Sequence, residues 1–184
     1  MPCISVGTDG SGTESSPSPW ARLAAAPGLS LGFRPFYLLA ALFALLGVPL
    51  WIANWQGAIQ PAGYLAGMAW HGHEMVFGFA AAVITGFLLT AVRNWTALPT
   101  PTGMTLAGLA LLWLLARVLM FAGPGAVAAI VDTTMLPVLA VAIGLPIWRS
   151  RNRRNYKILL VLAALTILNL VFHTSRMPET VRKR

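Results

Sequence analysis

Long apolar runs alternate with short polar segments along most of the chain. The runs cover about 36–55, 70–93, 105–122, 126–148 and 156–174. A helix of about 20 residues rises about 1.5 Å per residue and crosses the hydrocarbon of a bilayer. Backbone polar groups inside hydrocarbon must be paired within their own segment, which a helix achieves. The pattern therefore predicts an all-α fold, a polytopic transmembrane helical bundle of about five spans over residues 31–174.

Composition and charge support a membrane protein. The chain is 57% hydrophobic and only 10% charged, whereas about a quarter of the residues of a soluble domain are charged. The net charge of +8 does not predict nucleic-acid binding, because the basic residues lie between and beside the apolar runs. We expect the lipid bilayer as partner and no nucleic acid.

The basic residues also predict the orientation of the chain. Segment 149–157 carries four arginines and a lysine, whereas loops 56–69 and 122–126 carry neither residue type. Cytoplasmic loops are enriched in Lys and Arg, so the amino terminus is expected in the cytoplasm. The basic tail, 175–184, would then lie outside, against that rule. Either the last run does not fully span, or the chain ends where a longer protein would continue.

Residues 1–30 differ in character from the rest of the chain. They are rich in Ser, Gly and Pro and lack the apolar core of a signal peptide. Such a composition predicts a disordered cytoplasmic arm. The arm holds Cys3, the only cysteine, so no disulfide forms within the chain.

All three histidines are expected near the outer membrane boundary. The stretch "WHGHEM" (70–75) opens the second run, and His173 ends the fifth. The second run passes inward and the fifth outward. His71, His73 and His173 should therefore lie at similar depth.

The helical period predicts which of these residues face the bundle, since positions three, four and seven apart share a face. One such stripe consists of His71, Glu74, Met75, Gly78, Ala82, Thr85 and Gly86. We expect His71 and Glu74 to point into the bundle and His73 to face elsewhere. The small residues of the stripe predict a close approach by another helix.

These side chains have the chemistry of a metal site. An imidazole can bind a metal through one nitrogen while a carboxylate such as Glu74 holds the other. Two histidines from facing helices are a sufficient axial pair for haem iron, and Met75 is a soft ligand suited to haem or copper. We therefore take His71, His73 and His173 as candidate metal ligands.

A structural interpretation of the same residues stays open. A histidine at the membrane interface that bonds to a backbone carbonyl needs no metal. The order His-x-His-Glu also differs from the His-Glu-x-x-His of zinc proteases, so a hydrolase is not indicated.

Two charges lie well inside the third and fourth runs, namely Arg117 and Asp132. An unpaired charge at this depth costs on the order of 3 kcal/mol or more. We expect the two to pair across the short hairpin. A haem propionate is the alternative partner of Arg117.

The same segments resemble a known family. "LGFRPFYLLAALFALLGVPLW" (31–51), "WHGHEMVFGFAAAVITGFLLTAVRNWT" (70–96) and "NYKILLVLAALTILNLVFH" (155–173) are similar to the amino-terminal portion of the NnrS family. The family consists of inner-membrane proteins of bacteria that are longer than this chain. The shorter length of this chain raises the question of whether it is a truncated form.

The resemblance implies a function and cofactors. NnrS proteins contain haem and copper and are linked to nitric oxide metabolism and resistance to nitrosative stress. The resemblance places His71, His73, Glu74 and Met75 in the metal-binding region, and His173 matches by its position at the end of its helix. Nitric oxide would be the small-molecule ligand, and the reaction, if one is catalysed, is left open.

Two other functions compete with that expectation. A transport or channel component would use Arg117, Asp132, Glu74 and the histidines to line a proton or ion path. A fragment without function would carry polar residues that have lost their partners. A haem absorption band separates the first expectation from transport.

Overall fold

The computed structural model describes residues 18–19, 26–65, 67–151 and 153–177, and these contain helices and no strand. The elements in chain order are the 3-10 helix η1 (Pro27–Leu29), α2 (Phe33–Trp55), α3 (Gly67–His73), the π-helix η2 (Glu74–Ala80), α4 (Ala81–Thr96), α5 (Gly103–Ala122), α6 (Gly125–Arg149), the 3-10 helix η3 (Arg153–Asn155) and α7 (Tyr156–Arg176). Helices α3, η2 and α4 are continuous and form one span, Gly67–Thr96.

Five helical segments of the described chain are long and apolar enough to cross a membrane, which confirms the predicted all-α bundle of about five spans. The first four spans begin one to three residues before the predicted runs, as α2 does at Phe33, whereas α7 begins at Tyr156. Most of the predicted arm, 1–30, and of the basic tail, 175–184, lies outside the described residues.

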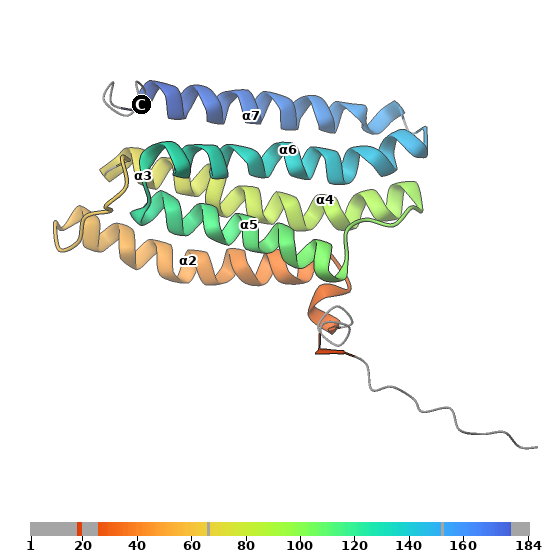
Figure 1. Cartoon of the computed structure of the whole chain (residues 1–184), viewed down its shortest axis with the longest axis horizontal. Coiled ribbons are helices and arrows are strands. Elements are labelled where there is room, and N and C mark those ends of the chain that lie inside the picture. Colours follow the sequence, from red (N-terminus) through yellow and green to blue (C-terminus); the bar gives the residue numbers. More distant parts are fainter. Residues whose placement is uncertain (1–17, 20–25, 66, 152, 178–184) are drawn as a thin grey trace, which may run out of the picture.

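The long helices lie side by side, with α2 and α7 at opposite edges and α4 and α6 between them (Figure 1). The span Gly67–Thr96 is the most buried of the five, whereas the first and last spans are the least buried. Leucines on the outer faces of α2 and α7, such as Leu45 and Leu160, are exposed. An exposed leucine is stable in contact with lipid, so these two helices present apolar faces to the bilayer.

Small residues bring α2 and α4 close together. A Cβ atom placed on Gly86 would lie 3.0 Å from Phe36 Cβ and 3.0 Å from Tyr37 Cδ1, both on α2. A Cβ on Gly78 would lie 3.1 Å from Phe43 of the same helix. The predicted close approach along this stripe is confirmed, and its partner is α2.

The loop 56–65 is attached to the hairpin between α5 and α6. The Gly63 N–H donates a hydrogen bond to the Phe121 carbonyl, at 3.0 Å. A Cβ on Gly63 would come within 2.6 Å of the Met120 carbonyl oxygen, so only glycine allows this approach. The attachment holds the loop over the end of the bundle where α2 and α7 finish (Figure 1).

Gly86→Leu should push α2 away from α4, because the larger side chain has no space against Phe36. We expect the free energy of unfolding to fall by about 1–3 kcal/mol, the usual cost of overpacking, measured by thermal unfolding in detergent. Gly108→Ala on α5 is the control, since a Cβ there meets no atom within 4 Å. That variant should match or exceed the wild type in stability, and equal stability of Gly86→Leu and the wild type would contradict the packing.

Candidate metal centre

A buried carboxylate, that of Asp132 on α6, is the centre of a polar cluster. Asp132 is 2% exposed. Its Oδ2 atom lies 3.1 Å from His73 Nε2, 3.0 Å from His173 Nε2 and 2.8 Å from Asn169 Nδ2. Its Oδ1 atom accepts a hydrogen bond from Arg117 Nη2. Side chains from three other helices thus converge on one residue of α6.

The expected pairing of Arg117 with Asp132 is confirmed, and the arginine binds a second carboxylate as well. Arg117 Nη1 lies 2.8 Å from Glu74 Oε1. Removing one member of a buried ion pair leaves an uncompensated charge. The guanidinium therefore holds Glu74 of η2 and Asp132 of α6 in fixed positions.

The position of His73 corrects the expectation that it faces away from the bundle. His73 is 1% exposed, and its Nδ1 atom lies 3.1 Å from Glu74 Oε1 while Nε2 contacts Asp132. Both ring nitrogens thus face carboxylate oxygens. A ring nitrogen that carries a proton donates to a carboxylate oxygen facing it, so His73 connects Glu74 with Asp132.

The π-helix η2 is the physical reason for that error. Its hydrogen bonds span one residue more than those of an α-helix, so each of its turns holds more residues. Counting back from Gly78 with the α-helical period therefore rotates the preceding residues to the wrong face. His73 lies on the buried face with Trp70 and Glu74, and His71 is turned toward its edge.

Gly78 and Trp113 support this local geometry. The Trp113 indole N–H donates to the Gly78 carbonyl at 3.1 Å. A Cβ on Gly78 would lie 2.9 Å from Glu74 Oε2 and 3.1 Å from Arg117 Nη1. The missing side chain thus leaves space for the ion pair, and the indole satisfies a carbonyl within the π-helix.

His71 and Met75, both expected in the metal-binding region, lie at the margin of the cluster. The ring of His71 stacks on Trp51 of α2, with centroids 4.1 Å apart and planes inclined by 18°. Its Nδ1 atom is buried and has no hydrogen-bond partner among the described residues. Met75 is half-buried. Glu74, by contrast, lies inside the cluster as expected.

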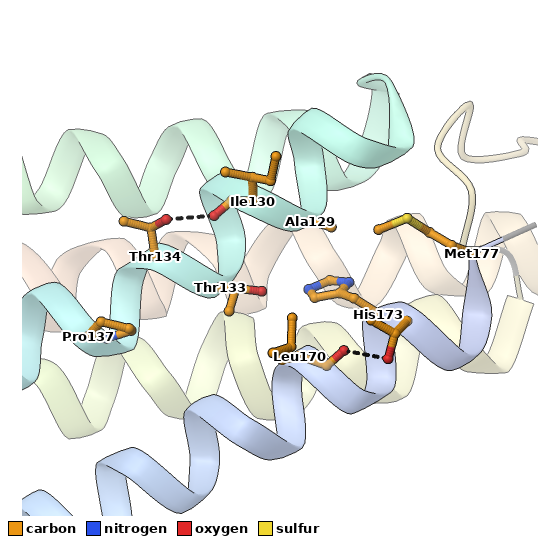
Figure 2. A pocket seen from close by; sticks show the side chains of 9 residues that line it. Ala129, Ile130, Thr133, Thr134, Pro137, Leu170, His173 and Met177 are labelled. Carbon is orange, nitrogen blue, oxygen red and sulfur yellow. Dashed lines mark hydrogen bonds between the residues drawn. The ribbon is translucent and has the colours of Figure 1, made fainter. Parts of the chain in front are cut away.

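His173 is buried at the end of α7 and has partners on both sides. Its Nε2 atom faces Asp132, and its Nδ1 atom forms a hydrogen bond with the Tyr64 hydroxyl. On another side the ring borders a groove of about 370 Å³ between α6 and α7. Thr133 and His173 point toward one another there, and Met177 lies beside them (Figure 2). Ile130 and Leu170, which line the groove, are exposed, so the groove opens on the outer face of α6 and α7.

Three residues of this cluster could hold one metal ion. His73, Asp132 and His173 each offer one atom, and the three atoms lie within 4.8 Å of one another. Metal bonds to imidazole nitrogen and carboxylate oxygen measure about 2.0–2.2 Å, which places neighbouring ligands roughly 3 Å apart. Two histidines and a carboxylate suit zinc, copper or iron. The residues therefore fit a small transition-metal ion.

A haem does not fit between His73 and His173 in this arrangement. Axial histidines lie on opposite faces of a porphyrin, with each nitrogen about 2 Å from the iron. The two rings have centroids 5.0 Å apart and are inclined by 51°, and their Nε2 atoms meet the same carboxylate oxygen. A porphyrin would have to displace Asp132 and Asn169 from the space between them.

The sequence did not predict some residues of the cluster as part of the site. Asp132 was predicted to pair with Arg117 or to line an ion path, and it was not among the predicted metal ligands. Tyr64 lies in a loop, 109 positions before His173 in the chain. Its position carries no local sequence signal, because only the folding of the loop onto the α5–α6 hairpin brings it to the site.

Asp132→Ala should destabilise the bundle strongly. The substitution removes the acceptor of four buried donors and leaves the Arg117 charge with one carboxylate. We expect the free energy of unfolding to fall by about 3–5 kcal/mol, measured by unfolding in detergent. Thr134→Ala is the matched control on α6, since Thr134 is exposed and bonds to its own helix at the Ile130 carbonyl. Equal stability of the two variants would contradict the role of Asp132.

Comparison with known proteins identifies the family of the chain. Neither a curated protein nor a solved structure matches it significantly. Residues 27–183 match the family described as NnrS protein, in agreement with the resemblance seen in the sequence. Because this match covers most of the 184 residues, the chain belongs to the NnrS family.

Proposed function

We propose that this multi-pass membrane protein binds a transition-metal ion through His73, Asp132 and His173 and acts in nitric oxide metabolism or resistance to nitrosative stress. The convergence of three buried ligand atoms on one position carries the proposal. Membership of the NnrS family supports the link to nitric oxide. Copper is the ion that the family resemblance favours.

The residues around the three ligands would orient them. Arg117 binds Asp132 Oδ1, and Asn169 Nδ2 donates to Oδ2, the oxygen that would also bind the ion. Glu74 accepts a hydrogen bond from His73 Nδ1, which directs Nε2 toward the same position. Three protein ligands leave a coordination position open, and a bound ion would offer that position to nitric oxide.

The groove between α6 and α7 supports a small uncharged ligand. Its lining is mostly apolar, from residues such as Ile130 and Leu170, and it extends to the His173 ring. Nitric oxide is uncharged and dissolves in hydrocarbon, so it would enter this groove from the bilayer. An inorganic ion would have to leave its hydration water behind to take the same route.

Charge distribution supports an inner-membrane protein whose amino terminus is cytoplasmic. The basic residues at the junctions of α4 with α5 and of α6 with α7 lie at the end of the bundle opposite the cluster (Figure 1). By the positive-inside rule that end is cytoplasmic. The metal centre would then lie near the periplasmic side.

Haem binding is a separate part of the proposal and depends on His71. The nitrogens of His73 and His173 are engaged within the cluster, whereas His71 Nδ1 has no partner among the described residues. Haem iron in proteins is commonly bound by a histidine, and His71 is the histidine whose ring lies outside the cluster. We therefore assign the predicted haem to His71 rather than to the pair His73 and His173.

A transport function has less support. A proton or ion path needs polar groups across the whole membrane. Away from the cluster, the described interior is filled by apolar side chains such as Leu89, Leu106 and Ile143, each 0% exposed. The polar cluster is confined to one end of the bundle.

Metal titration tests the ion-binding proposal. We expect the purified chain to bind one Cu²⁺ or Co²⁺ per molecule, followed by visible absorption, and His73→Ala and His173→Ala to weaken binding more than about 100-fold, since each removes a direct ligand. His71→Ala is the matched control and should bind the ion as the wild type does. Wild-type affinity in the His73 and His173 variants would contradict the assignment.

Haem loading tests the assignment of His71. Reduced-minus-oxidised spectra of membranes containing the wild type should show a haem band that His71→Ala loses and His173→Ala keeps. Loss of the band in His173→Ala alone would show that the histidine pair holds the haem, which the assignment excludes. No haem band in the wild type would also contradict it.

A further inference from the structure

Both histidines of the metal centre have a hydrogen-bond partner on the nitrogen that faces away from the candidate ion. For His73 that partner is the carboxylate of Glu74, the neighbouring residue. For His173 it is the hydroxyl of Tyr64, from the loop between α2 and α3. The two partners occupy equivalent positions but come from different parts of the chain.

Packing contacts hold the ring of Tyr64 in one position. It packs against a buried apolar cluster that includes Leu65, Trp70 and Met120. A Cβ on Gly125, at the start of α6, would lie 3.0 Å from Tyr64 Cδ1, so the glycine leaves the space that the ring fills. Together with the attachment of Gly63 to Phe121, this packing fixes the hydroxyl against His173.

A phenol suits this position chemically. Its hydroxyl can both donate and accept a hydrogen bond. When His173 Nε2 binds an ion, the ring proton must sit on Nδ1. The Tyr64 oxygen can then accept that proton's hydrogen bond, and in the ion-free protein it can donate to the same nitrogen.

We propose that Tyr64 is a positioning residue of the metal centre. Its hydroxyl holds His173 through Nδ1 so that Nε2 points at the ion, as Glu74 does for His73. The loop 56–65 is thereby tied to the occupancy of the site. The inference rests on the proposed function, because it assigns a role toward the ion held by His73, Asp132 and His173.

Tyr64→Phe tests the inference, because it removes the hydroxyl and keeps the ring. Partners of this kind contribute about 10–100-fold to metal affinity, so we expect the variant to bind Zn²⁺ and Co²⁺ that much more weakly than the wild type, in the full chain in detergent. Tyr37→Phe is the matched control, since Tyr37 lies on α2 near the opposite end of the bundle and is 42% exposed. It should leave the affinity unchanged.

Nitrogen NMR of histidine-labelled protein gives a readout that packing alone does not move. The chain has three histidines, so the spectrum is simple to assign. With Zn²⁺ bound, the wild type should show His173 ligated through Nε2 and protonated at Nδ1. In Tyr64→Phe the Nδ1 signal of His173 should shift to that of a nitrogen without a hydrogen bond to a hydroxyl. Ligation through Nδ1, or an unchanged signal, would overturn the proposal.

The outcomes separate this inference from the proposed function. If the wild type binds none of Cu²⁺, Zn²⁺ and Co²⁺, both proposals fail. If the wild type binds them and Tyr64→Phe binds equally well, only the role of Tyr64 fails. Should Tyr64→Phe not fold, Gly125→Ala decides, since its Cβ displaces the tyrosine ring and keeps the hydroxyl. We expect a several-fold loss of affinity there, and unchanged affinity would overturn the proposal.

Discussion

The buried carboxylate of Asp132 is the constraint on which the organisation of this bundle depends. A charge inside a membrane protein is stable only when it is paired and its hydrogen bonds are complete. Arg117 of α5, His73 at the end of α3, and Asn169 and His173 of α7 supply the donors. One side chain of α6 therefore connects three other helices, including α7, which lies at the edge of the bundle (Figure 1).

The arrangement that satisfies the carboxylate also explains how the site would hold an ion. The two imidazole nitrogens that point at Asp132 are the same atoms that would bind a metal, so an ion would take the place of protons there. Glu74 and Tyr64, on the far sides of the rings, keep both histidines aimed at that position. The rest of the described interior is mostly apolar, so the charged and imidazole groups of the cluster gather at one end of the bundle.

The sequence predicted much of this structure and missed specific parts for physical reasons. Five spans and the Arg117–Asp132 pair followed from the length of the apolar runs and from the cost of charge in lipid. The facing of His73 was wrong, because a π-helix changes the period and leaves no pattern in the residue types. Tyr64 reaches His173 through the folding of a loop, which local periodicity does not describe. The ligand roles themselves stay predictions.

X-ray absorption spectroscopy of the copper-loaded protein would test the central claim, that His73, Asp132 and His173 together hold one metal ion. We expect two imidazole nitrogens and a carboxylate oxygen at about 2.0–2.2 Å from the metal, with the outer-shell scattering typical of imidazole rings. The signal of one imidazole should disappear in His173→Ala. A metal environment without imidazole scattering, or one unchanged in that variant, would contradict the account.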